Sequence, residues 1–183
     1  MLQDRLGTRG FTLMELLLTA AIAATLMAIA VPIFGDLTES SRLNTATRDV
    51  ERELQTARLK AVSANTTLRV RINCPAAGQV RIVEWIGSPA IDDAGNRCND
   101  VAYPYPAPDT DILTEPNNDG PIRRVAFGTT LSTAIIEFRP DGTAREVVGG
   151  VVQSIAGTVG VTVTRASGSK TVQVNALGKI NIQ

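Results

Sequence analysis

The chain has 183 residues, a length typical of one domain, and its 44% apolar and 20% charged residues are typical of a globular protein. Eighteen basic and eighteen acidic residues cancel, so no overall charge attracts DNA or anionic lipid. The chain has no histidine and only two cysteines, which argues against histidine-dependent hydrolases and structural zinc sites, so we expect a non-catalytic protein without a cofactor or resident metal.

The first predicted element is an apolar helix over residues 11–34, a run of 24 residues whose only charge is Glu15. Such a helix is about 36 Å long, enough to cross the core of a bilayer. Arginines precede the run and acidic residues follow it, which predicts a single-pass anchor with a cytoplasmic N-terminus and an exported C-terminal part. The small residue Gly10 lies before the run, not after it as in a secretory signal peptide, so cleavage at Gly10 would leave the anchor attached.

Glu15 is the anomaly of this segment, because a carboxylate inside a membrane helix costs about 2.5–3.5 kcal/mol and therefore predicts a partner. One interpretation is that Glu15 lies near the interface and reaches water. The other is that cleavage between Gly10 and Phe11 creates an ammonium group on Phe11 at the depth of Glu15, on the same chain or on a neighbour.

The hexapeptide Gly10–Glu15 reads Gly-Phe-Thr-Leu-Met-Glu and resembles the signature of type IV prepilins and of the pseudopilins of type II secretion. The resemblance implies that residues 1–10 are a leader, that a prepilin peptidase cuts after Gly10, and that it N-methylates the new amine of Phe11. Phe11 and Glu15 are then the expected assembly pair, and the apolar helix is the expected core of a filament.

The helix is predicted to continue to about residue 65, because apolar residues recur at intervals of three and four. This stripe consists of Leu43, Ala46, Val50, Leu54, Ala57, Ala61 and Ala64. The other faces carry charges, Arg58 among them, and are interpreted as solvated, so the stripe is expected to pack on a sheet. Pro32 predicts a kink inside the apolar run, and in the resembled family a proline at this place accompanies a bent or melted stretch.

From residue 66 the period changes from 3.6 to 2, which predicts a series of short antiparallel strands. The expected strands are 67–72, 80–85, 123–127, 135–139, 144–148, 159–165, 170–174 and 179–182. A long N-terminal helix followed by such strands predicts an α+β domain over about residues 35–183.

Further motifs resemble the GspH/FimT family of minor pilins and pseudopilins. They are Leu54-Gln-Thr-Ala-Arg58 followed by Ala61, then Phe138-Arg-Pro-Asp-Gly-Thr143, and Gly178 near the C-terminus. The resemblance implies a type IV pilin-like fold and a structural subunit that initiates or caps assembly of a type IV pilus or a type II secretion pseudopilus. Its implied partners are the prepilin peptidase, other minor and major subunits, and an inner-membrane assembly platform.

Residues 86–121 interrupt the strand pattern and are expected to form a long irregular insertion, a kind of segment that is commonly functional. Apart from Arg97, their charges are acidic: Asp92, Asp93, Asp100, Asp109, Asp111, Glu115 and Asp119. These acids either hold Ca²⁺ or are simply solvated, and no EF-hand spacing is present.

Cys74 and Cys98 are expected to form a disulfide, since the periplasm is oxidising. Closing this loop contributes about 3.5 kcal/mol in the chain-entropy model. Two buried free thiols are the alternative, whereas the lack of Cys-x-x-Cys spacing argues against a redox-active pair.

DNA binding in natural transformation is the alternative function, because some FimT-like minor pilins bind DNA through a Gly-Arg-x-Arg stretch near the C-terminus. Residues 178–181 here read Gly-Lys-Ile-Asn, so Lys179 is the one matching candidate for a DNA contact. Arg69, Arg71 and Arg81 can add a local basic patch, although the alternation of Arg69 and Arg71 also fits a solvent face opposite the core.

Overall fold

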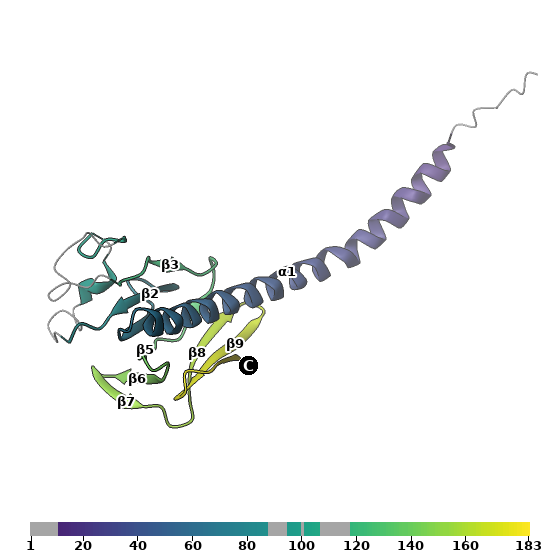
Figure 1. The fold of residues 1–183 in the computed structure, drawn as a ribbon. Coiled ribbons are helices and arrows are strands. Elements are labelled where there is room, and N and C mark those ends of the chain that lie inside the picture. Colours follow the sequence, from purple (N-terminus) through teal and green to yellow (C-terminus); the bar gives the residue numbers. More distant parts are fainter. Residues whose placement is uncertain (1–10, 88–94, 100, 107–117) are drawn as a thin grey trace, which may run out of the picture. The chain divides into compact units, whose positions relative to one another are not determined.

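A computed structural model describes the chain over residues 11–87, 95–99, 101–106 and 118–183 (Figure 1). The chain divides into two compact units, one ending at Thr38 and the other comprising Glu39–Gln183, and helix α1 (Leu13–Ser63) contributes to both. The remaining elements are antiparallel strands and one short 3₁₀ helix, η1 (Gly95–Cys98). The predicted α+β architecture, a long N-terminal helix with antiparallel sheets, is confirmed.

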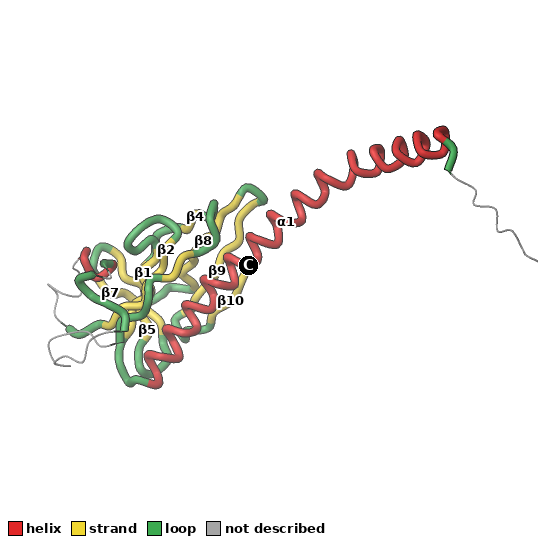
Figure 2. The backbone as a smooth tube through the Cα atoms, turned by 90° about the horizontal axis from the view of Figure 1, so that it is seen from above, coloured by secondary structure: helices red, strands yellow, loops and turns green. Residues whose placement is uncertain are grey.

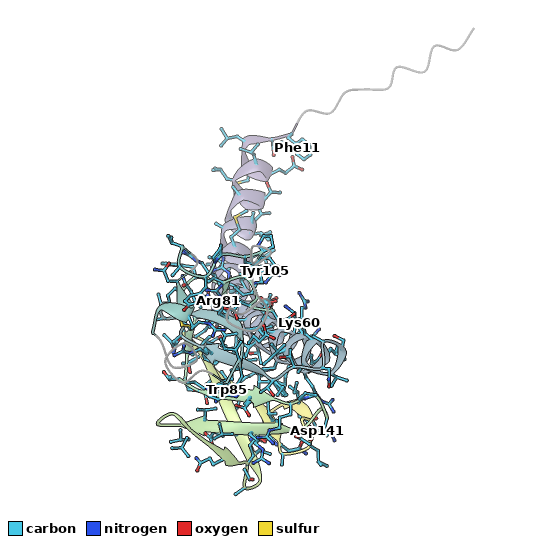
Figure 3. All side chains as sticks on the ribbon, turned by 60° about the vertical axis from the view of Figure 1, so that its left-hand side comes forward. Phe11, Lys60, Arg81, Trp85, Tyr105 and Asp141 are labelled. Atoms are coloured by element: carbon cyan, nitrogen blue, oxygen red, sulfur yellow. A yellow bond between two sulfur atoms is a disulfide. The ribbon has the colours of Figure 1, made fainter. Side chains whose placement is uncertain are left out.

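The first part of α1, up to Thr38, is an apolar helix whose described large side chains are all exposed. By length and composition it can cross a membrane. Figure 3 shows the side chains of this segment projecting outward around the helix. The side chain of Pro32 is not described, so the kink expected there stays a prediction.

α1 ends at Ser63 because Asn65 adopts a left-handed conformation, with a φ of 51°. The N–H of Thr66 donates to the carbonyl of Ala61 at 3.1 Å, which is the six-to-one bond of a Schellman cap. Ala64, predicted to extend the buried stripe, therefore lies beyond the helix and is exposed.

Two antiparallel sheets follow α1 (Figure 2). The six-stranded sheet has the order β3 (Arg123–Arg124), β2 (Gln79–Glu84), β1 (Leu68–Ile72), β5 (Ile135–Phe138), β6 (Ala144–Val148) and β7 (Val151–Ser154). The four-stranded sheet has the order β10 (Ile180–Ile182), β9 (Gly168–Asn175), β8 (Thr158–Arg165) and β4 (Thr130–Leu131).

The core of the second unit lies between α1 and both sheets, which Figures 1 and 2 show lying alongside the helix. The predicted stripe residues Leu43, Ala46, Val50, Leu54, Ala57 and Ala61 are all buried. They pack in one cluster with inward-facing side chains of the sheets, such as Phe138 of β5 and Val161 of β8. Each large apolar side chain buried in this way contributes about 1.5–3 kcal/mol.

The strand prediction differs from the structure in two ways. The strand expected over residues 123–127 is reduced to the two residues of β3, and the alternation pattern does not predict β4 or β7. β7 pairs with β6 across Gly149 and Gly150, whose φ angles are 59° and 82°. Two glycines with positive φ favour a tight hairpin turn, and this signal identifies β7 where alternation fails.

Candidate functional site

The N-terminus of helix α1 is capped by reciprocal hydrogen bonds between Thr12 and Glu15. The N–H and the hydroxyl of Thr12 donate to Oε2 of Glu15 at 2.9 and 3.0 Å, and the N–H of Glu15 donates to the Thr12 hydroxyl at 3.3 Å. This arrangement is a capping box, which satisfies N–H groups that the first turn of a helix leaves unpaired. The capping box was not predicted, although Thr-x-x-Glu before an apolar run is its sequence signature.

Glu15 keeps the capacity to accept a cation in this arrangement. Both bonds from Thr12 end on Oε2, and a carboxylate has about four acceptor positions. Phe11, directly before the cap, is 85% exposed (Figure 3), and Gly10 lies outside the described residues. Cleavage between Gly10 and Phe11, methylation of the Phe11 amine and its pairing with Glu15 therefore stay predictions.

In the second unit, three motifs that are far apart in sequence meet at the guanidinium of Arg58. Its Nε donates to the carbonyl of Gly142 at 3.0 Å, and a terminal nitrogen donates to the carbonyl of Leu177 at 3.3 Å. Gly178 lies against both Arg58 and Gly142. The solvated position predicted for Arg58 is wrong, because this half-buried side chain joins α1 to the β5–β6 and β9–β10 turns.

Replacing Gly178 by alanine is expected to destabilise the second unit by about 3 kcal/mol. The φ of Gly178 is 71°, and a Cβ there would overlap the carbonyl oxygen of Gly142 and lie 2.7 Å from Nε of Arg58. The left-handed backbone costs about 1–2 kcal/mol and the overlap a similar amount. Denaturant unfolding measures the loss, and Gly149→Ala (φ 59°, no heavy atom within 4 Å) is the control for backbone strain alone. Equal losses for the two variants would contradict the packing role of Gly178.

Arg69 is buried, contrary to the solvent face predicted for it. Its Nε donates to Oε2 of Glu137 at 2.9 Å, and its guanidinium lies 3.8 Å from the centre of the Trp85 ring. Glu137 is the register partner of Arg69 across the β1–β5 pair. An ion pair formed across two strands therefore replaces contact with water at this position.

Arg81 is buried beneath the insertion and anchors it (Figure 3). Its guanidinium donates to four backbone carbonyls of the insertion, those of Arg97, Asn99, Tyr103 and Gly120. The neighbours of Arg81 in β2, Val80 and Ile82, point into the core, so Arg81 lies on the opposite face of the sheet. The described residues of the insertion cover this face, and β2 is consequently buried on both sides.

A second buried arginine, Arg97, fastens the insertion further. It donates to Oδ1 of Asp119 at 2.6 Å and to Oδ2 at 3.2 Å, and it also donates to the carbonyl of Glu84. From α1, Nζ of Lys60 donates to the carbonyl of Asn118 at 2.7 Å. Burial lowers the pKa of Lys60, an effect that the charges of Glu84 and Asp119 oppose.

A disulfide joins Cys74 to Cys98, with the Cα atoms 5.1 Å apart. It ties the segment after β1 to the last residue of η1, directly beside Arg97. The disulfide and the two buried arginines thus hold the same part of the insertion.

The structure describes one acid of the insertion, Asp119, and this carboxylate is engaged by Arg97. The other acids considered for calcium, Asp92, Asp93, Asp100, Asp109, Asp111 and Glu115, lie outside the described residues. Within the described ranges no group of three or more His, Cys, Asp or Glu side chains is arranged to hold a metal ion. The calcium interpretation draws no support from this part of the chain.

Lys179, the candidate DNA contact, is exposed in the turn before β10 and lines a shallow hollow with Arg58. Neither interpretation of Arg69, Arg71 and Arg81, a local basic patch or a solvent face, fits the structure. Arg69 and Arg81 are 3% and 1% exposed, and Arg71 is partly buried, so these side chains do not form an exposed basic surface. Phosphate binding requires cations that reach the surface, which leaves Lys179 without support from these arginines.

A protein-family model described as type II transport protein GspH matches residues 46–178 of the chain. The match covers more than half of the chain and contains Arg58, Gly142 and Gly178, the residues that meet where α1 contacts the β5–β6 and β9–β10 turns. No curated protein and no solved structure matches the chain.

Proposed function

The chain belongs to the GspH family of type II transport proteins, and from this premise we propose that it is a minor pseudopilin that helps to initiate or cap a type II secretion pseudopilus. GspH family pseudopilins are structural, non-catalytic subunits. The observation that carries the proposal is the family match over residues 46–178, which follows an N-terminal helix that can anchor the chain in a membrane. The role in initiating or capping the filament is proposed in addition to the family match.

In the proposed pathway the subunit waits in the inner membrane with its second unit in the periplasm. A prepilin peptidase removes residues 1–10, cutting after Gly10, and methylates the amine of Phe11. The apolar helix then leaves the bilayer and enters the core of a filament together with other minor and major pseudopilins. An inner-membrane assembly platform drives this transfer, and Pro32 provides the bend that packing in the filament requires.

Glu15 is proposed to set the register of the subunit in the filament. Its Oε2 closes the first turn with Thr12, and its remaining acceptor positions take the ammonium of Phe11 on the same or a neighbouring subunit. A carboxylate left without a partner in an apolar core is costly, so only the paired arrangement is stable.

A clean deletion strain, scored in parallel for secreted enzymes and for surface pili, tests the proposed function. The expected result is loss of secretion with normal pili, because the family match is to a type II transport protein. Loss of pili with normal secretion would instead assign the chain to a type IV pilus. If neither changes, the proposal of an assembly initiator is wrong.

Three variants of the capping box separate the charge of Glu15 from its structural role. Glutamine also forms a capping box, so Glu15→Gln keeps the helix start and removes only the charge, whereas Thr12→Ala weakens the cap and keeps the charge. We expect Glu15→Gln and Glu15→Ala to abolish complementation of the deletion. Either change leaves the ammonium of Phe11 buried without its carboxylate, which costs about 3 kcal/mol or more. This cost corresponds to about a hundredfold or greater loss of incorporation of the subunit into the filament. Thr12→Ala is expected to retain most secretion.

Membrane insertion of each variant is measured in the same strains by extraction with alkaline carbonate. Normal insertion with lost secretion supports an assembly role for the carboxylate. Full secretion with Glu15→Gln would contradict the charge-pairing proposal and leave Glu15 with the role of a helix cap.

A further inference from the structure

Phe127 is fully exposed at the tip of the loop that joins β3 to β4. The loop turns at Gly128, which has a φ of 78°, and the N–H of Thr129 donates to the carbonyl of Ala126 at 3.2 Å. An aromatic side chain presented to solvent by an ordered turn is available for contact with an apolar partner, which would remove the ring from water.

The backbone of this loop is held by the buried side chain of Arg165, which comes from the end of β8. Arg165 donates to the carbonyl of Phe127 at 2.7 Å and to the hydroxyl of Thr129 at 2.8 Å. The same guanidinium donates to Oε2 of Glu39 at 3.1 and 3.3 Å. Ser167, in the β8–β9 turn, donates to the carbonyl of Glu39 as well. The Phe127 loop is thus fastened to Glu39, the first residue of the second unit.

The residue to which the loop is fastened lies close to the apolar run along the chain. Glu39 follows Phe34, the last residue of the apolar run, by five residues, which span at most about 18 Å when fully extended. The opposite end of the unit lies far along α1. Leu177 also has an exposed apolar side chain (71%), and its backbone carbonyl accepts a hydrogen bond from Arg58. Arg58 lies about 28 Å along the helix from Glu39.

The charges around Phe127 favour an anionic surface. Arg42 and Arg165 share the single carboxylate of Glu39, so this group of three side chains carries a net positive charge. Arg124 is exposed and lines the same surface hollow as Phe127. An aromatic ring beside an exposed arginine is a combination that the interface of an anionic bilayer accommodates, with the ring at the headgroup level and the guanidinium group beside a phosphate.

We propose that the Phe127 loop docks on the periplasmic surface of the bilayer, with Phe127 in the headgroup region and Arg124 against anionic phospholipid, while the subunit is anchored in the membrane. This contact orients the second unit on the bilayer and is broken when the subunit is extracted into a filament. The inference rests on the membrane anchor of the proposed function, and the experiment below separates the two.

The test uses the full chain reconstituted into vesicles of phosphatidylethanolamine and phosphatidylglycerol that contain a lipid with a nitroxide headgroup. A fluorescent thiol label is placed beside the loop in Ala126→Cys and, as the matched control, beside Leu177 in Ala176→Cys, since both alanines are exposed. Cys74 and Cys98 are joined to each other and do not take the label.

Quenching of the label at position 126 but not at position 176 is the expected result. Phe127→Ser added to the first variant should reduce this quenching, whereas Leu177→Ser added to the second should change nothing. Arg124→Ser should lower the ratio of docked to undocked loops about fivefold, the effect of one arginine at an anionic surface. Replacing phosphatidylglycerol by phosphatidylcholine should also reduce the quenching at position 126.

Equal quenching at both positions, or none at position 126 in chains that resist carbonate extraction, overturns the docking proposal and leaves the anchor intact. If carbonate extracts the chain from the vesicles, both the anchor and the docking proposal are wrong. Quenching at position 126 that persists in vesicles without the nitroxide lipid comes from a neighbouring labelled subunit and also overturns the lipid contact.

Discussion

Replacing Asp119 by alanine is expected to destabilise the second unit by about 3–5 kcal/mol, the usual cost of removing one partner from a buried ion pair. Asp119 is 2% exposed and receives two hydrogen bonds from Arg97. Its Oδ2 also lies 4.0 Å from the guanidinium of Arg81. The substitution leaves the charges of two buried arginines without their carboxylate, and it removes the acceptor for the N–H of Glu84.

The free energy of unfolding in denaturant, measured on the full chain in detergent micelles, provides the test. Trp85 is the one tryptophan of the chain and follows β2, so its fluorescence reports on the second unit. Asp49→Ala is the matched control. Asp49 makes an exposed ion pair with Arg52 at 4.0 Å, and such pairs contribute less than about 1 kcal/mol. A loss below about 1 kcal/mol for Asp119→Ala would contradict a structural role for the buried pair.

Removal of the disulfide by Cys74→Ala with Cys98→Ala is expected to lower the free energy of unfolding by about 3.5 kcal/mol, the chain-entropy value for a loop of this length. The disulfide spans 24 positions and ends beside Arg97. Because Cys98 and Arg97 are adjacent, the loss should not be additive with that of Asp119→Ala. A double-mutant cycle over the two changes therefore measures how far the disulfide acts by positioning the arginine.

Reduction of the native chain with dithiothreitol should reproduce the loss seen in the alanine variant, and alkylation of the freed thiols keeps the bond open during the measurement. A stability unchanged by both treatments would show that the insertion is held by Arg81 and Arg97 alone. Secretion in strains complemented with the double variant tells whether the disulfide is required for assembly as well as for stability.

Local pattern was sufficient to predict the elements that form the core. The 3.6-residue period places Leu43 to Ala61 on one buried face of α1, and the period of two predicts most of the strands of both sheets. These predictions succeed because burial follows from the spacing of apolar residues, a property of neighbouring positions. The capping box of Thr12 and Glu15 is equally local and was predictable from its signature.

The polar interior depends on contacts between segments far apart in the chain. Arg69, Arg81 and Arg97 are charged residues that the sequence alone assigns to the surface, and each is buried by a partner that lies outside its own element. For Arg69 the partner is Glu137, 68 positions away, and for Arg97 it is Asp119, 22 positions away. The spacing of residues along the chain carries no information about such pairs.

The sequence by itself was sufficient to predict the long apolar helix, the α+β class and the stripe that packs helix on sheet, and it contains the cleavage signature, because apolar periodicity and a short motif express these features directly. The tertiary structure alone decided that described residues of the insertion cover the second face of β2, that Arg58, Gly142 and Gly178 meet, and that Arg165 fastens the Phe127 loop to Glu39. The physical reason is the satisfaction of buried polar groups, which requires partners that only the folded chain brings within hydrogen-bond distance.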